Sequence, residues 1–84
     1  MAAADAIRNF QELTIGDFVN FEVLHDGIWK PARIAYSALQ PWGMDELSAR
    51  QVFDSNLDRI AAVAQKLANT TPVGETIKLA SYDF

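Results

Sequence analysis

Few side chains in this sequence lie at spacings that catalysis or metal binding requires. His25 is the only histidine and there is no cysteine, so the chain cannot assemble a zinc site from histidine and thiolate ligands. The serines and threonines match no spacing known for nucleophilic catalysis, and the 4 glycines are dispersed rather than gathered into a phosphate-binding loop. We therefore lean against an enzyme and predict no catalytic residue, no metal site and no cofactor.

Two carboxylates have a spacing that allows chemistry. Asp54 and Asp58 are four residues apart in a predicted helix, where they could supply two oxygen ligands or an acid–base pair. We favour a solvated helix face, because Arg50 precedes Asp54 by four residues and offsets part of the repulsion. His25 also has a structural interpretation, since it lies beside a predicted turn.

Asn56 and the tryptophans are the stronger binding candidates. Helical spacing puts Asn56 near the middle of an apolar stripe, where an unpaired amide would cost about 1 to 3 kcal/mol. We expect its side chain to form hydrogen bonds with backbone groups of the sheet or of a loop. A bound ligand is the alternative hydrogen-bond partner. Trp42 is expected at the edge of the core. Trp29 lies with Leu24 on a face expected to be uncovered, which suggests an interaction patch.

A β-hairpin is the clearest predicted element. Residues 18 to 24 and 28 to 35 flank Asp26-Gly27, which suits a two-residue type I′ turn because both of its positions need positive φ. That turn sets the facing pairs: Leu24 with Trp29, Glu22 with Pro31, and Asn20 with Arg33. One face then carries the core side chains: Val19, Phe21, Val23, Ala32 and Ile34.

A third strand is predicted at about residues 75 to 80, where Ile77 and Leu79 alternate with polar residues. Pro31 lacks an N–H on the free edge of the second hairpin strand, so we expect the third strand beside the first. This gives the sheet order 2-1-3, with the third strand parallel to the second. Residues 7 to 15 fit either a helical turn and a half or an extra strand.

One long helix is predicted over about residues 46 to 68, capped by Asp45 and preceded by a short helical turn at 37 to 42. Its apolar stripe should cover the core face of the sheet. The stripe consists of Ala49, Val52, Phe53, Asn56, Ile60, Val63, Ala64 and Leu67. The predicted fold is thus a two-layer α+β domain over residues 1 to 84, frayed at 1 to 6. The pattern leaves open whether 82 to 84 pack.

Composition limits the classes of function. Half of the residues are hydrophobic, and 7 basic residues stand against 11 acidic ones, so nucleic acid is an improbable partner unless the basic groups gather on one face. The N-terminal residues lack the basic segment and apolar run of a signal peptide, and no apolar run is long enough to span a membrane. We expect a cytoplasmic protein without a membrane partner.

The order and spacing of several short patterns resemble a bacterial family of small proteins known as domain of unknown function 1488. The resemblance covers about three quarters of the chain. Its residues are Val19-x-Phe21, Asp26-Gly27, Ile34, Ala38-Leu39, Phe53-x-x-Asn56-x-x-Arg59-Ile60-x-x-Val63-Ala64, Ile77-x-Leu79 and Asp83-Phe84. The resemblance implies a small α+β fold and supplies no activity, substrate, cofactor or catalytic residue for this chain. Asn56 and Arg59 fall in its most recognisable stretch.

Two main hypotheses follow for function. The first is a small non-enzymatic binding or regulatory module whose partner is an unidentified protein or a second copy of the chain, forming a homodimer. The alternative is a small-ligand-binding protein or an enzyme with a site near Asn56 and Arg59, assisted by Trp42. A component of a nucleic-acid complex ranks last because of the acidic balance.

Overall fold

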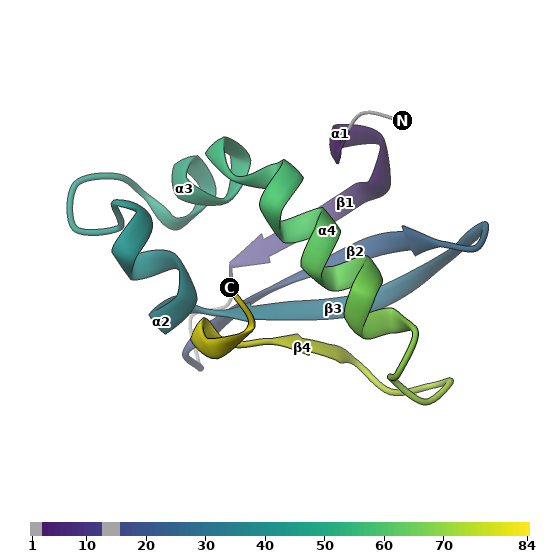
Figure 1. Ribbon diagram of the computed structural model, residues 1–84. Coiled ribbons are helices and arrows are strands. Elements are labelled where there is room, and N and C mark those ends of the chain that lie inside the picture. The colour runs from purple at the N-terminus through teal and green to yellow at the C-terminus, as the bar shows by residue number, and fades with distance from the viewer. Residues whose placement is uncertain (1–2, 13–15) are drawn as a thin grey trace.

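The computed structural model describes residues 3–12 and 16–84. A four-stranded mixed sheet lies against helices, as the α+β prediction requires (Figure 1). The sheet contains, in spatial order, β1 (Ile7–Glu12), β2 (Phe18–His25), β3 (Ile28–Ala35) and β4 (Ile77–Leu79). The helical elements are α1 (Ala3–Ala6), α2 (Tyr36–Leu39), η1 (Gln40–Trp42), α3 (Ala49–Ser55), α4 (Leu57–Ala68) and η2 (Ser81–Asp83).

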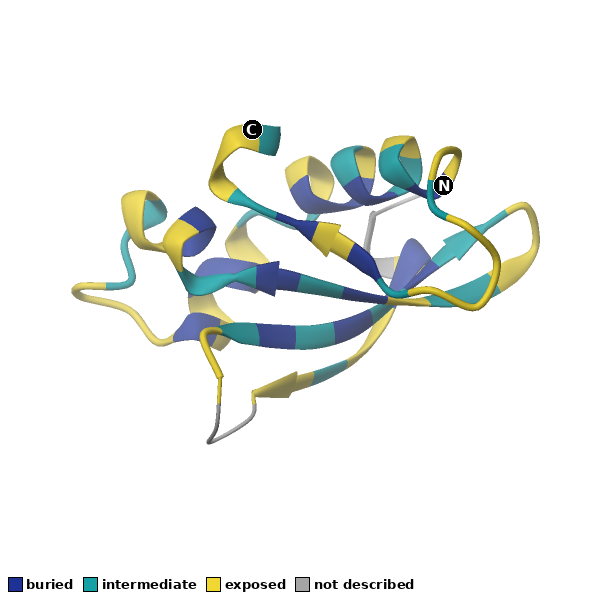
Figure 2. Ribbon diagram, turned by 90° about the horizontal axis from the view of Figure 1, so that it is seen from below, coloured by how far each residue is buried: buried dark blue, intermediate teal, exposed yellow. Residues whose placement is uncertain are grey.

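The predicted hairpin is confirmed in its turn and its register. Asp26 has φ 52° and Gly27 has φ 76°, the positive values that a type I′ turn needs at both positions. Strands β2 and β3 pair antiparallel with Asn20 opposite Arg33. Buried and half-buried positions alternate along most of β2 and along the second half of β3, from Ala32 to Ala35 (Figure 2). Turn chemistry and burial thus select the same pairing.

The predicted sheet order 2-1-3 is wrong, because β4 pairs with β3 rather than with β2. The pairing is parallel, as predicted for the direction, and it runs from Ala32↔Ile77 to Ile34↔Leu79. Proline removes one N–H only, and this ladder begins one residue beyond Pro31, where every N–H is present. The strand covers 77–79 instead of the predicted 75 to 80.

The other edge of β2 is taken by the segment that the sequence leaves undecided. Ile7–Glu12 forms β1, antiparallel to β2, with an irregularity between Arg8 and Gln11 where Asn9 has φ 59°. The rest of the undecided segment, residues 13–15, lies outside the described residues. Ala3–Ala6 forms a helical turn with Ala6 buried, although the sequence predicts fraying there; residues 1 and 2 are not described.

The predicted long helix is in fact two helices, α3 and α4, which meet at Asn56. Backbone φ is −124° at this residue, and its side-chain Nδ2 donates to the Val52 carbonyl oxygen at 2.8 Å. Side-chain bonding to a carbonyl one turn back competes with the helical ladder and bends it. The helix starts at Ala49 because Ser48, not Asp45, caps it through a capping box with Gln51.

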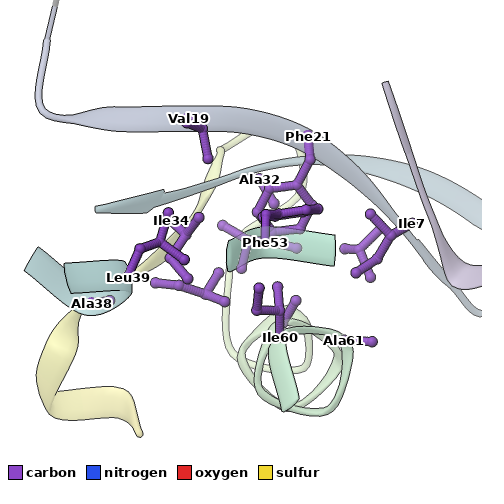
Figure 3. Packing of buried hydrophobic residues seen from close by; sticks show 14 of the residues in the cluster. Ile7, Val19, Phe21, Ala32, Ile34, Ala38, Leu39, Phe53, Ile60 and Ala61 are labelled. Atoms are coloured by element: carbon purple, nitrogen blue, oxygen red, sulfur yellow. The ribbon is translucent and has the colours of Figure 1, made fainter. Parts of the chain in front are cut away.

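The core lies between the sheet and the helices. Phe53 is 1% exposed, and its ring centroid is 4.9 Å from that of Phe10 and 5.1 Å from that of Phe21. Figure 3 shows Phe21 and Phe53 converging with Ile60 from α4. The predicted turn before the long helix is confirmed as α2 and η1, and it places Leu39 fully inside this core.

Tyr36 joins the end of β3 to β1, because its hydroxyl donates to Glu12 Oε1 at 3.3 Å. Burial raises the pKa of the Tyr36 phenol above 10.0, and the negative charges of Glu12 and Asp17 add to the increase. The folded state therefore retains this proton more strongly than the unfolded state. The resulting stabilisation is present below the unfolded pKa and is lost as pH rises through the folded pKa.

We predict that absorbance at the phenolate wavelength will show this shift. Subtracting the titration of Tyr36→Phe from that of the wild type isolates the Tyr36 phenol, and its midpoint should exceed 10.0. The same subtraction in concentrated urea should bring the midpoint down. A folded-state midpoint at or below the urea value would contradict the assigned burial and Glu12 contact.

Candidate functional site on the open face of the sheet

The helices pack on one face of the sheet, and no helix of the described chain covers the other (Figures 1 and 2). We call this second surface the open face. Because side chains alternate along a strand, the residues between the buried positions of each strand point to it. Its members on the paired strands are Arg8 and Gln11 on β1, Phe18, Asn20, Glu22 and Leu24 on β2, Trp29, Pro31, Arg33 and Ala35 on β3, and Lys78 on β4.

One row of polar residues crosses all the strands of the open face. The register pairs Gln11 with Asn20, Asn20 with Arg33, and Arg33 with Lys78. Neighbouring members lie on adjacent strands, about 4.8 Å apart. The row contains amide, guanidinium and ammonium groups and no carboxylate, so it presents many hydrogen-bond donors and net positive charge.

A shallow groove of about 330 Å³ is lined by two members of this row, Gln11 and Asn20, and not by Arg33 or Lys78. It takes residues from β1, β2 and β3, together with Thr76, which precedes β4. Its lining consists of Asn9, Gln11, Asn20, Phe21, Glu22, Pro31, Ala32 and Thr76. Amide and hydroxyl side chains dominate the polar part of this lining, and each can both donate and accept hydrogen bonds.

The carboxylate of Glu22, the one acidic side chain among the paired residues of this face, is already engaged. Its Oε1 accepts from Arg8 Nε at 3.0 Å and also from Asn9 Nδ2. The Arg8 guanidinium carbon lies 4.1 Å from the centroid of the Trp29 ring. Trp29, a predicted binding residue, therefore lies on the open face as expected, with the Arg8 guanidinium over its ring.

Every arginine of the sequence stacks on an aromatic ring, at 4.1 to 4.9 Å from carbon to ring centroid. Arg33 lies over Phe18 on the open face and Arg50 over Phe10. Stacking occupies the face of a guanidinium and leaves the N–H donors at its edges available. These pairs join residues that are distant in the sequence, and no local pattern predicts them.

The remaining predicted binding residues lie away from the open face, and their groups have partners within the chain. Arg59 stacks 4.9 Å above the Trp42 ring, and Phe84 packs edge-on against Trp42 with centroids 4.9 Å apart. Trp42 thus lies at the edge of the core, as expected. Of the C-terminal segment whose packing the sequence leaves open, Phe84 contacts Trp42 but is 39% exposed, and Tyr82 is 87% exposed. The Asn56 amide bonds Val52 within its own helix, instead of the sheet or loop backbone predicted.

The other candidates for chemistry form no cluster. Asp54 pairs with Arg50 at 3.0 Å on an exposed helix face, as the sequence indicates. His25 Nε2 lies 3.3 Å from Asp26 Oδ2 beside the turn. Across residues 3–12 and 16–84, no group of three or more histidine, cysteine or acidic residues could hold a metal ion. In the same ranges no helix is long and apolar enough to cross a membrane.

A second depression, of about 370 Å³, lies between β1 and the helices. Its apolar wall contains Ile7, Phe10, Phe53 and Leu57, and its polar rim contains Arg8, Asn9, Arg50 and Asp54. This size is at the lower end for small-molecule sites, which combine an apolar floor with a few polar groups. The depression adjoins the bend at Asn56, but Asn56 and Arg59 do not line it.

Comparison of the chain with protein-family models, curated proteins and solved structures found no match. Sequence reasoning gave Trp29 and the Asn20–Arg33 pair, but it missed Lys78 as their neighbour. The position of Lys78 follows from the pairing of β4 with β3. The prediction based on Pro31 placed this last strand on the opposite edge of the hairpin, beside β2.

Proposed function

We propose that this protein is a small, cytoplasmic, non-enzymatic binding module that engages a protein partner through the open face. The observation that carries the proposal is the row from Gln11 to Lys78, a line of polar and charged groups across a sheet face without a helical cover. The side chains of Arg33 and Lys78 have no ion-pair partner within the described ranges. Arginine is enriched in protein interfaces, and charged groups there contribute electrostatic complementarity with the partner.

Charge also indicates how the partner binds. The paired residues of the open face include three cations, Arg8, Arg33 and Lys78, and one carboxylate, whereas the chain as a whole carries −4. Two copies meeting through this face would bring like charges together. A heterologous partner is thus favoured over a homodimer built on this surface. Membership of the domain of unknown function 1488 family would be compatible with this role.

Site-specific photocrosslinking in native lysate tests the proposal. A photoreactive phenylalanine analogue at Asn20 samples the open face, and the same analogue at Ala62, exposed on α4, is the matched control. We expect a discrete crosslinked protein from Asn20 alone, because the partner covers that side of the sheet. Equal capture from both positions, or capture from Ala62 only, would contradict the proposal.

Small-ligand binding is the second candidate function, favoured by the depression between β1 and α3. Arg50 at its rim and the apolar wall around Phe53 suit an amphipathic carboxylate. Such a ligand would shift the NMR signals of Phe10 and Leu57 and leave those of Lys78 unchanged. The predicted contacts of Asn56 and Arg59 would then be indirect, through the bend between α3 and α4.

A further inference from the structure

We infer that the open face recognises an extended acidic segment of its partner, with carboxylates placed on Arg33 and Lys78. This inference rests on the proposed function and specifies the chemistry of the partner. It follows from the adjacency of two like charges, from the donors they present, and from the groove that runs beside them.

Arg33 and Lys78 are direct neighbours on β3 and β4. Like charges directly opposite each other on a sheet are destabilising, and the nearest open-face carboxylate, Glu22, is bonded to Arg8 and Asn9. The chain itself therefore leaves this pair of cations uncompensated within the described ranges. An external anion bridging them would remove the repulsion and gain charge-assisted hydrogen bonds.

The geometry of Arg33 favours a carboxylate as that anion. Its guanidinium carbon lies over the Phe18 ring, 4.6 Å from the ring centroid, a contact that restricts where the guanidinium can lie on the open face. A planar fork of N–H donors matches the two oxygens of a carboxylate. Lys78 is exposed and adds a mobile ammonium beside it.

The groove explains why the acidic group should belong to an extended chain. Asn9, Gln11 and Asn20 line it with carboxamides, which can pair with the N–H and C=O groups of a peptide backbone. Gln11 and Asn20 belong to the same row as the two cations. Arg33 and Lys78 do not line the groove, but their near neighbours in the chain, Ala32 and Thr76, do. A segment lying across the strands in this groove would thus pass beside the two cations and could place its carboxylates on them.

Nucleic acid fits these features less well. A polyanion would extend beyond this small positive area, and the rest of the molecule is strongly acidic because the whole chain carries −4. The phosphate backbone would be repelled outside the patch. A short acidic segment confines its charge to the area that attracts it.

Fluorescence anisotropy with labelled probes tests the inference. The probes are a short peptide of alternating glutamate and serine, its glutamine counterpart and a single-stranded oligothymidylate of similar length. The proteins are the wild type, Lys78→Glu and Lys66→Glu. Lys66 lies exposed in the last turn of α4, so its reversal changes the net charge equally without altering the open face.

We expect the glutamate peptide to bind the wild type and the glutamine peptide to bind at least about tenfold more weakly. Lys78→Glu should abolish most of this binding while leaving the thermal midpoint equal or higher, because the introduced carboxylate would pair with Arg33. Lys66→Glu should bind like the wild type. NMR shifts should centre on Asn20, Arg33 and Lys78.

Equal binding of both peptides, or equal loss in both lysine variants, would overturn the inference. Binding of oligothymidylate alone would assign the face to nucleic acid instead. A crosslinked partner captured from Asn20 without any binding of the glutamate peptide would remove this inference and leave the proposed function standing. Binding of the glutamate peptide without capture of a lysate protein at Asn20 would support the preference of the open face for acidic peptides and contradict the proposed function.

Discussion

Replacing Phe53 by alanine should cost about 3 to 5 kcal/mol of unfolding free energy. The side chain is 1% exposed and packs between Phe10 of β1 and Phe21 of β2, so its removal leaves a cavity where sheet and helix meet. A chain of 84 residues has about 4 to 13 kcal/mol of total stability. The variant should be partly unfolded at moderate temperature.

Urea unfolding followed by far-UV circular dichroism measures this loss. Asp54→Ala is the matched control, since the neighbouring residue only makes an exposed ion pair with Arg50, worth less than about 1 kcal/mol. A Phe53→Ala variant as stable as Asp54→Ala would show that the aromatic cluster does not join β1 to the helices as the structure has it.

Leu39→Ala should have the second largest effect, a loss of about 2 to 5 kcal/mol. Leu39 is fully buried, although it belongs to a helical segment of only 4 residues that would be unstable by itself. Its burial anchors α2 to the core. The short helical segment η1 follows directly and contains Trp42, which packs against Phe84.

Thermal unfolding and tryptophan fluorescence report on this anchor. The control is Ser37→Ala in the same segment, where the side chain is exposed and the expected change is within about 0.5 kcal/mol. Equal midpoints for the two variants would mean that α2 is held by its flanking elements and not by the side chain of Leu39.

The hairpin was predictable because its information is local. Asp26-Gly27 supplies both positive φ values, and a slip by one residue would bury Asn20 and Arg33, so turn and burial select one register. The short turn ending in Gly43, where φ is 116°, and the α+β class follow from similar local signals.

The helix break shows where local reasoning stopped being sufficient. Periodicity supports one helix over 46 to 68, because Val52, Asn56 and Ile60 share a face. In the structure, the side-chain amide of Asn56 donates a hydrogen bond to the Val52 carbonyl oxygen. The helix is divided into α3 and α4 at this residue. Periodicity reports which face is buried, whereas the partner of a polar group depends on which carbonyl is within reach.

The candidate site shows the same division between sequence and tertiary structure. That Trp29, Asn20 and Arg33 share the uncovered face can be predicted from the sequence, because alternation along a strand is a property of the local chain. That β4 joins β3 and brings Lys78 beside Arg33 emerges only from the folded chain. The choice between two sheet edges depends on long-range packing and backbone pairing, and a single proline does not settle it.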